Sequence, residues 1–318
     1  MISLPHLRTF MAVARLMSFT RAAYELSLSQ PAVSAHVAAL EEALGVRLFE
    51  RTGRRIVLTD AGRIVYRAAQ DISDRMRQLE SELEDLGELR SGVIRIGASR
   101  IAGVYLLPRI ITSFRERFPD IEIHVTNHTA HTIARLVEDN AFDLAVVCEG
   151  DAEQYPTAAV GMKRIGTDDL VLVAPNGRTV SSLKVFRPGD VLSPEEVQSE
   201  SFILSGPDTA SARNLRRQLA NLGLHLKSTI VMDDAGAIKR TVEEGAGLAI
   251  LSRSAVEREL AEGRLVEVTV PGWSLSRGIF MLWRNDRRFS RNTEVFMEFL
   301  KNRLSEKGNG AADIPVPN

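Results

Sequence analysis

The sequence of 318 residues is poor in cysteine and in long apolar runs. Its one cysteine, Cys148, lies in an apolar run, so no intrachain disulfide can form, and we expect a small buried side chain in a reducing compartment. Uninterrupted apolar stretches such as Leu144–Cys148 and Leu248–Leu251 have about five residues, whereas a membrane-spanning helix needs about 20. The early run Phe10–Ala14 is broken by Arg15 and is too short for a signal peptide. These absences exclude disulfide scaffolds and membrane proteins and predict a cytoplasmic chain.

The sequence also lacks the common motifs of catalytic and nucleotide-binding sites. It has no P-loop, no Gly-x-Gly-x-x-Gly after the first strand of its α/β part, no His-Glu-x-x-His and no Gly-x-Ser-x-Gly. We therefore predict that the protein is not an enzyme and needs no cofactor. With 44% hydrophobic and 25% charged residues, the chain is not of the disordered or collagen-like class, and its length corresponds to two or three domains.

Lysine is missing from the first part of the chain and does not occur before Lys163. The total charge is only −1, but residues 1–67 hold nine arginines against five acids, a net +4, which leaves −5 for the rest. The use of arginine in place of lysine can also result from the base composition of the genome. A small basic head on an acidic body is nevertheless typical of a polyanion-binding module joined to another domain.

The basic head is predicted to form three helices and a hairpin. The spacing of apolar residues predicts helices at His6–Met17 and Phe19–Leu26 and a third helix from Gln30. A turn between two short apolar segments predicts a hairpin with strands at Val46–Glu50 and Ile56–Leu58. Ser29 can cap the third helix, and Pro31 lies in its first turn, where the missing N–H is not needed. Two short helices joined by a short polar turn form a helix-turn-helix, to which the hairpin adds a basic wing.

Thr59 and Asp60 begin a long helix that is predicted to reach about Leu89. Its apolar residues are spaced 4, 3, 4 and 3 apart, as in a coiled coil, at Ile72, Met76, Leu79, Leu83 and Leu86. A single-chain amphipathic helix would also show such a stripe. Because the residues on either side are polar and leave only a narrow stripe, we predict that the helix pairs with a second copy.

From Gly92 the pattern changes to short apolar strands that alternate with helices, which is typical of α/β domains. The predicted strands are Val93–Gly97, Ile121–Thr126, Leu144–Val147, Leu170–Ala174, Phe202–Leu204, Thr229–Met232, Leu248–Leu251, Leu265–Val270 and Ile279–Trp283. The predicted helices are Val104–Phe118, Thr132–Asn140, Ala210–Leu222, Ala235–Glu244, Arg253–Ala261 and Arg291–Leu304. The Gly-, Asn- and Pro-containing tail Gly308–Asn318 is predicted to be disordered.

A specific motif in the head resembles a known family. The run Phe19–Glu41 (FTRAAYELSLSQPAVSAHVAALE), followed by Leu44–Arg51 and Leu58–Gly62, closely resembles the LysR-type transcriptional regulators, and the resemblance extends from His6 through Leu304. It implies an N-terminal all-α winged helix-turn-helix, a dimerising linker helix, and an α/β effector domain similar to periplasmic binding proteins, with two lobes joined by two crossovers.

These features predict the division of the chain and its partners. The predicted parts are a DNA-binding domain at 1–59, a linker helix at 60–90, a first lobe at 91–166 and 268–305, a second lobe at 167–267, and a disordered tail at 306–318. We expect a homodimer or a dimer of dimers that binds double-stranded DNA at an imperfect palindromic operator. A small-molecule effector and RNA polymerase are the other predicted partners.

The third helix is the predicted recognition helix. Such a helix presents its first turn to base edges in the major groove, which places Gln30 and Ser34 on one exposed face, with His36 two residues further along. Glutamine can pair bidentately with adenine. The resemblance implies that the first turn of the recognition helix occupies the DNA-contacting positions of the family. It also implies that the tip of the wing contacts phosphate or the minor groove, as in other family members. The predicted DNA-binding residues are Thr20, Arg21, Ser29, Gln30, Pro31, Ser34, His36, Arg54 and Arg55.

The recognition helix departs from the family at one point. Many members have arginine or lysine near its middle, where this chain has Ala35, Ala38 and Ala39. Fewer phosphate contacts should flatten the salt dependence of DNA binding. We therefore expect dimerisation and the wing arginines to carry a larger share of the affinity.

The effector residues are predicted at strand ends. Ser99 and Arg100 follow the first strand of the α/β domain and precede a helix, so they could hold an anion, or could equally be a capping serine beside a solvated arginine. By resemblance, Thr129, Ser205 and Asp233 are further cleft positions, and we expect an anionic metabolite. The similar regulators of carbon-fixation or sulfur-assimilation operons usually have a Gly-Ser-Gly-Thr-Arg loop. The corresponding segment here, Ser205–Arg213, contains an additional acidic residue, and its arginine lies at a different position.

Three histidines, His124, His128 and His131, lie close together in the sequence. No cysteine joins them, and a structural zinc site normally has four ligands, so we predict ordinary histidines and no metal. Two other functions stay open. A solute-binding sensor without gene regulation would have an export signal and no basic head, and an architectural DNA-binding protein would have no effector.

Overall fold

The structure of the chain, a computed structural model, describes residues 2–52, 55–84, 92–149, 159–180, 184–206 and 210–306. The chain divides into two units, Met1–Leu86 and Gly87–Asn318. None of the helices in the described ranges is both long enough and apolar enough to cross a membrane.

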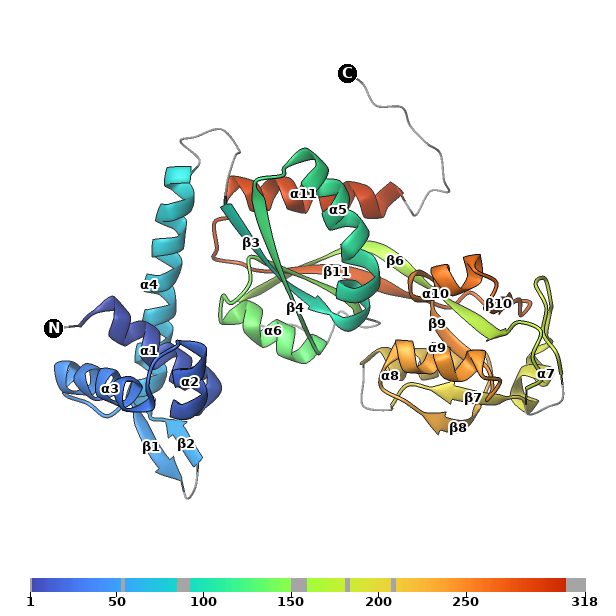
Figure 1. Cartoon of the computed structure of the whole chain (residues 1–318), viewed down its shortest axis with the longest axis horizontal. Coiled ribbons are helices and arrows are strands. Elements are labelled where there is room, and N and C mark those ends of the chain that lie inside the picture. Colours follow the sequence, from blue (N-terminus) through green and yellow to red (C-terminus); the bar gives the residue numbers. More distant parts are fainter. Residues whose placement is uncertain are drawn as a thin grey trace. The chain divides into compact units, whose positions relative to one another are not determined.

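The first unit consists of helices and one hairpin (Figure 1). Its elements are α1 (Leu4–Leu16), α2 (Phe19–Glu25), α3 (Gln30–Leu44), β1 (Phe49–Thr52), β2 (Arg55–Leu58) and α4 (Asp60–Glu84). Ser3, Ser18 and Ser29 each accept a backbone N–H at the start of α1, α2 and α3. Gly45 ends α3 with a φ of 69°, a left-handed conformation that glycine adopts without strain. The predicted winged helix-turn-helix is confirmed, although its first strand begins later than expected.

Apolar residues from α1 and α3 meet in the core of this unit. Phe10, Val33, Leu40 and Leu48 are completely buried. Gly62, in the first turn of α4, lies against the chain just before the hairpin. A Cβ atom at Gly62 would be 2.1 Å from the carbonyl oxygen of Leu48, so glycine is what allows α4 to approach this closely.

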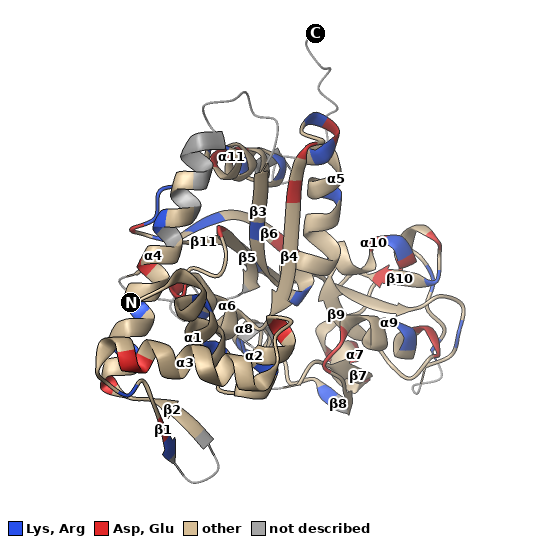
Figure 2. Cartoon of the chain, turned by 60° about the vertical axis from the view of Figure 1, so that its left-hand side comes forward, with Lys and Arg blue, Asp and Glu red and all other residues tan. Residues whose placement is uncertain are grey.

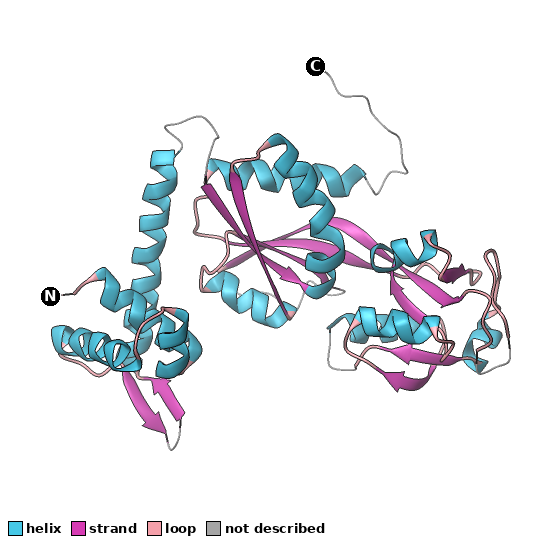
Figure 3. Ribbon diagram, in the orientation of Figure 1, coloured by secondary structure: helices cyan, strands magenta, loops and turns pink. Residues whose placement is uncertain are grey.

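The second unit has two lobes, and the first is a sheet covered by helices on both faces (Figure 3). Its elements are β3 (Gly92–Ser99), η1 (Ala102–Leu106), α5 (Leu107–Arg117), β4 (Ile121–His128), α6 (Ala130–Glu138), β5 (Leu144–Glu149), part of β6 (Val160–Pro175), β11 (Ser276–Arg284) and α11 (Arg291–Glu306). The strands follow the order β6-β11-β5-β3-β4, in which β3 is parallel to β4 and β5. The helices α5 and α11 pack on one face of the sheet, and α6 packs on the other.

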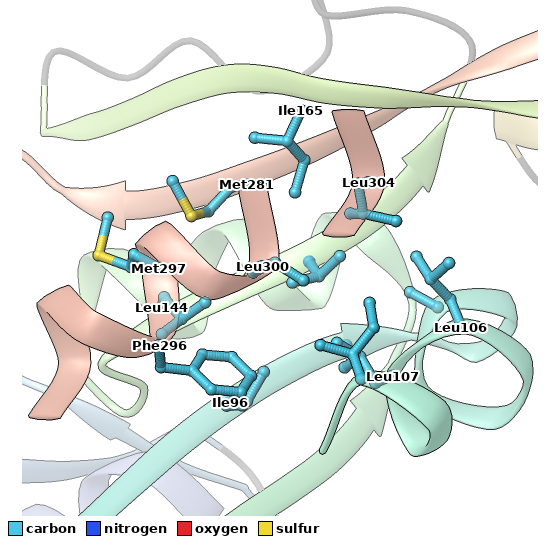
Figure 4. Packing of buried hydrophobic residues seen from close by; sticks show 14 of the residues in the cluster. Ile96, Leu106, Leu107, Leu144, Ile165, Met281, Phe296, Met297, Leu300 and Leu304 are labelled. Atoms are coloured by element: carbon cyan, nitrogen blue, oxygen red, sulfur yellow. The ribbon is translucent and has the colours of Figure 1, made fainter. Parts of the chain in front are cut away.

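The core of the first lobe forms where α11 meets the sheet (Figure 4). Phe296, Leu300 and Leu304 lie on one side of α11 and are buried against Ile96 and Met281 of the strands. Burial of one aliphatic or aromatic side chain contributes about 1.5–3 kcal/mol to the free energy of folding. The helix α11 follows the return of the chain from the second lobe, and its buried side chains stabilise the first lobe.

The second lobe is built around the other end of β6. Its elements are α7 (Pro194–Ser199), β7 (Ser201–Leu204), α8 (Ala210–Asn221), β8 (Lys227–Val231), α9 (Ala235–Glu243), β9 (Ala249–Ser252), α10 (Arg253–Ala261) and β10 (Leu265–Val268). β7 and β8 are parallel, whereas β9 and β10 pair with β6 in antiparallel fashion. The core of this lobe also contains Val268, Val270 and Leu275, which the predicted division at 267/268 assigns to the first lobe.

The two strands β6 and β11 connect the lobes. β6 pairs with β11 in the first lobe and with β9 and β10 in the second. Arg277 on β11 is the register partner of Asp168 on β6, and its Nε donates to Asp168 Oδ2 at 2.8 Å. Ser252 Oγ donates to the other carboxylate oxygen at 2.6 Å. The side chains of the Asp168–Arg277 pair are both only 6% exposed, so this ion pair is buried in the crossover.

Two elements of the second unit differ from the sequence-based expectation. β6 begins ten residues before the predicted strand Leu170–Ala174. The part before Leu170 contains Lys163, Arg164 and Asp168 and is not apolar, but it pairs with β11 from Val160 to Asp169. Helix α7 has no apolar stripe that predicts it. A capping box instead begins this helix, in which the side chains of Ser193 and Glu196 each accept the backbone N–H of the other.

Candidate nucleic-acid interface and effector cleft

The first turn of α3 brings together four of the predicted DNA-contacting residues. Ser29 Oγ accepts the N–H of Ala32 at 3.3 Å and caps the helix, and Pro31 is exposed in the first turn. Gln30 Nε2 donates to Ser34 Oγ at 3.0 Å, one turn further along. A glutamine amide has two donor hydrogens and an acceptor oxygen, so this bond leaves one donor and the acceptor available to a base.

His36 lies apart from this group. Its half-buried ring is directed toward α1, where Nδ1 is 3.0 Å from Thr9 Oγ1 and the ring centroid is 4.9 Å from that of His6. Buried apolar residues such as Val33 and Val37 lie on the same side of α3. In this structure His36 therefore packs α3 against α1 instead of joining Gln30 and Ser34.

The remaining predicted DNA-contacting residues are spread over α2 and the wing. Thr20 is exposed near the start of α2, and the guanidinium of Arg21 donates to the carbonyl oxygen of Leu16 at the end of α1. Arg54 lies outside the described residues. Arg55 is described only as a backbone position in β2.

The middle of the exposed surface of α3 is small and uncharged, and the exposed Glu42 near its end is acidic. Ala35 and Ala38 are exposed, and α3 contains no lysine or arginine (Figure 2). The nearest described arginines in the sequence belong to other segments, such as Arg21 on α2 and Arg47 before the hairpin. Attraction of phosphate by side-chain charge must therefore come from segments that flank the recognition helix.

Glu41, which the sequence pattern does not single out, fixes the hairpin to the recognition helix. Its Oε1 accepts the N–H groups of Leu48 at 2.7 Å and Phe49 at 3.3 Å, and its Oε2 is 3.0 Å from Arg47. The neighbouring Glu42 is exposed, and nothing in the sequence distinguishes the two acids. The wing is thus held at a defined position beside α3 by one carboxylate.

Replacing Glu41 with alanine is expected to destabilise the first unit by about 1–3 kcal/mol, because two backbone N–H groups lose a charged acceptor. Chemical denaturation followed by far-UV circular dichroism measures this loss. Glu42→Ala is the matched control and should leave the unfolding midpoint almost unchanged. Equal midpoints for the two variants would show that Glu41 does not anchor the hairpin.

The apolar stripe of α4 is buried near the start of the helix and exposed further along. Ala69 is buried in the core of the first unit. Further along, Ile72, Met76 and Leu79 are 43%, 40% and 52% exposed, respectively. The side chain of Leu83 and the whole of Leu86 lie outside the described residues. An exposed apolar row at the spacing of a coiled-coil seam is what a helix that pairs with a second copy presents.

In the second unit, Ser99 and Thr129 lie at neighbouring strand ends. Ser99 on β3 is the register partner of His128 on β4, and Thr129 follows directly. Ser99 is buried and its Oγ accepts the N–H of Cys148 at 3.0 Å, so it ties β3 to β5 and does not cap a helix. Thr129 caps α6 through the N–H of Thr132. The expected burial of Cys148 is confirmed.

Ser205 and Asp233 occupy the corresponding place in the second lobe. They follow the parallel strands β7 and β8, and a Cβ atom on Gly206 would be 2.5 Å from Asp233 Oδ1. Arg100 reaches them from the first lobe, with its guanidinium 3.4 Å from the carbonyl oxygen of Asp233 and 3.7 Å from Asp234 Oδ2. The structure therefore brings Arg100, Asp233 and the Ser205–Gly206 turn together, with a carboxylate already beside the cation.

The three histidines do not converge. His124 Nε2 is 2.6 Å from Glu122 Oε1, His128 packs 6.2 Å from the ring of Phe142, and His131 is exposed on α6. Across the part of the chain that the structure describes, no group of three or more His, Cys, Asp or Glu side chains is arranged to hold a metal ion.

These features define a class of protein. A winged helix-turn-helix with an exposed, capped recognition helix, followed by a long helix and a two-lobed α/β unit with polar residues at its strand ends, is the architecture of a ligand-responsive DNA-binding protein. Residues 4–63 match the bacterial regulatory helix-turn-helix protein of the lysR family, and residues 87–305 match the LysR substrate binding domain. The chain belongs to the LysR family of transcriptional regulators.

Known proteins resemble the whole chain. The RuBisCO operon transcriptional regulator of Allochromatium vinosum is 30% identical over 299 residues, which cover 94% of this chain and 95% of that protein. A full-length OxyR variant from Pseudomonas aeruginosa has a TM-score of 0.66 at 21% identity, over 96% of this chain and 95% of that one. CbnR in complex with its target DNA has a TM-score of 0.56 at 19% identity, over 95% of this chain and 100% of that one. The protein is a DNA-binding transcriptional regulator with an effector-binding domain, and not an enzyme.

Proposed function

We propose that this regulator acts in the cytoplasm as a homodimer, or a dimer of such dimers, on an imperfect palindromic operator. The description of its relative from Allochromatium vinosum makes a carbon-fixation operon the proposed target. A small molecule held between the lobes would shift the balance between two arrangements of the dimer, to the extent that it binds one arrangement more tightly.

One observation carries the proposal for DNA. Gln30 and Ser34 lie side by side at the capped, exposed end of α3, where a helix can enter the major groove with its polar side chains toward the bases. The exposed stripe on α4 of the same unit supports pairing of two such heads. Thr20, Arg21 and the wing arginines Arg54 and Arg55 are proposed to contact the phosphate backbone.

The effector is proposed to lie among Ser99, Arg100, Thr129, Ser205 and Asp233. Arg100 is the cation that would recognise an anionic group, because a guanidinium can form two parallel hydrogen bonds to a carboxylate or phosphate. In the structure it already faces the carboxylate of Asp234. An anionic effector would have to displace that carboxylate, which favours a strongly charged or bidentate group.

Gln30→Ala is expected to lower the affinity for the operator about 10- to 100-fold, the cost of one lost bidentate base contact of about 1–3 kcal/mol. The operator is first selected from random duplexes by the unmodified protein, and affinities are measured by fluorescence anisotropy at one salt concentration. Affinity for unrelated DNA should not change. Gln198→Ala, which alters an exposed glutamine of α7, is the matched control. Unchanged operator affinity in Gln30→Ala would show that α3 does not read the DNA.

A further inference from the structure

Charged side chains join the two lobes through helices that face each other. The first-lobe segment η1 contacts α10 of the second lobe. On α5, which continues η1, Arg109 forms a two-pronged ion pair with Glu257 of α10, with distances of 3.3 Å from Nη1 to Oε1 and 3.2 Å from Nη2 to Oε2. The parallel geometry is that of a guanidinium matched to a carboxylate.

A second contact encloses a buried cation. Lys239 Nζ on α9 donates to Glu259 Oε1 and to the carbonyl oxygen of Ala255, both at 2.7 Å. Its ammonium group is 5.0 Å from the ring centre of Tyr105, which belongs to η1 of the first lobe. The side chains of Lys239 and Glu259 are only 11% and 9% exposed. Burial raises the pKa of the Tyr105 hydroxyl, and the nearby carboxylates of Asp234 and Glu259 raise it further.

The third contact is the approach of Arg100 to Asp234, at 3.7 Å. Arg100, Tyr105 and Arg109 thus follow one another along a continuous helical segment at spacings of five and four. The π-helical turn η1 (Ala102–Leu106), whose hydrogen bonds join residues five apart, contains Tyr105 and lies between Arg100 and Arg109. All three residues of this segment contact the second lobe.

Two of these contacts, Arg100–Asp234 and Arg109–Glu257, differ from the crossover in their exposure to solvent. The side chains of Arg109 and Glu257 are 66% and 52% exposed, so their attraction is weakened by salt. The Asp168–Arg277 pair on β6 and β11 is buried and is screened much less. The connection between the lobes is thus resistant to salt, whereas the exposed Arg109–Glu257 and Arg100–Asp234 contacts are sensitive to it. The ammonium of Lys239 beside Tyr105 is buried and is screened less.

We infer that Arg100–Asp234, Tyr105–Lys239 and Arg109–Glu257 form a latch that holds the two lobes closed. Breaking or screening its charges lets the lobes separate about the intact β6–β11 crossover. This inference goes beyond the proposed function, because it concerns the resting state of the effector domain without DNA or effector. The latch would set the population of closed domains on which any effector acts.

The test is single-molecule energy transfer on the full chain, with dyes on Glu298→Cys of α11 and Ala261→Cys of α10. Both positions are exposed, and the native Cys148 is buried, so labelling is selective. Labelled chains are diluted into excess unlabelled chains, so that each oligomer carries one labelled copy. Arg109→Glu is expected to reduce the closed, high-transfer fraction up to about fivefold, and Glu257→Arg should act likewise.

The charge-swapped double variant Arg109→Glu/Glu257→Arg should restore the closed fraction, which a general loss of folding would not allow. Arg115→Glu, an exposed charge reversal on the same helix, should have no effect. Raising salt from about 0.05 M to about 1 M should open the unmodified chain without any substitution. The latch is refuted if Arg109→Glu matches Arg115→Glu, if the double variant stays open, or if salt leaves the distribution unchanged. Operator binding is measured separately, so failure of either proposal is recognised on its own.

Discussion

Met76→Glu combined with Leu79→Glu is expected to convert the protein into a monomer and to lower its affinity for a two-half-site operator about 10²- to 10⁴-fold. Both side chains are exposed in the middle of the α4 stripe, where a paired helix would bury two glutamates against apolar residues. In a dimer the second half-site is bound at a high effective concentration, and the monomer loses this advantage without losing any base contact.

Analytical ultracentrifugation gives the oligomeric state, and fluorescence anisotropy compares the full operator with a single half-site. Affinity for the single half-site should be nearly the same in the variant and the unmodified chain. Val191→Glu, an apolar-to-acid change at an exposed position of the second unit, should leave the dimer intact. A variant that remains dimeric would place the dimer interface elsewhere.

Asp168→Ala is expected to destabilise the second unit by about 3–5 kcal/mol, the cost of removing one partner of a buried ion pair. Arg277 would keep its charge in the crossover without its carboxylate, and Ser252 would lose the acceptor of its hydroxyl. Both tryptophans of the chain, Trp273 and Trp283, belong to the second unit. Urea unfolding followed by tryptophan fluorescence therefore reports on this unit alone.

The double variant Asp168→Leu/Arg277→Met removes both charges and should be more stable than Asp168→Ala, because no uncompensated charge is left buried. Arg258→Ala breaks an exposed pair with Glu262 and should leave the unfolding free energy almost unchanged. If Asp168→Ala proves as stable as Arg258→Ala, the buried pair does not stabilise the crossover.

The elements of the head were predictable because their signals are local. The serines that precede α2 and α3 each accept a backbone N–H only three residues further along. Gly45 ends α3 where its sequence position predicts. The seam of α4 is likewise a repeat along one helix. For the same reason the sequence placed Gln30 and Ser34 on one turn, and the structure shows them hydrogen-bonded.

Residues whose roles depend on distant partners were not predictable. His36 is close to Gln30 in the sequence, but its ring packs against α1 because of Thr9 and His6. The part of β6 before Leu170 has a polar composition typical of a loop, yet it is a strand because β11 pairs with it and Arg277 neutralises Asp168. Glu41 is distinguished from Glu42 only by the backbone of the hairpin that it binds.

Sequence alone was therefore enough for the family, the helix-turn-helix, the capped recognition helix and the apolar seam, since motif, capping and periodicity act over a few residues. The contacts between charged and aromatic side chains of the two lobes depend on the tertiary structure. Arg100 and Asp234, Tyr105 and Lys239, and Arg109 and Glu257 are each separated by more than a hundred residues, and their approach follows from the packing of η1–α5 near α9 and α10. Ion pairs and cation–aromatic contacts over such separations carry no sequence pattern, because they depend on where folded elements come to lie.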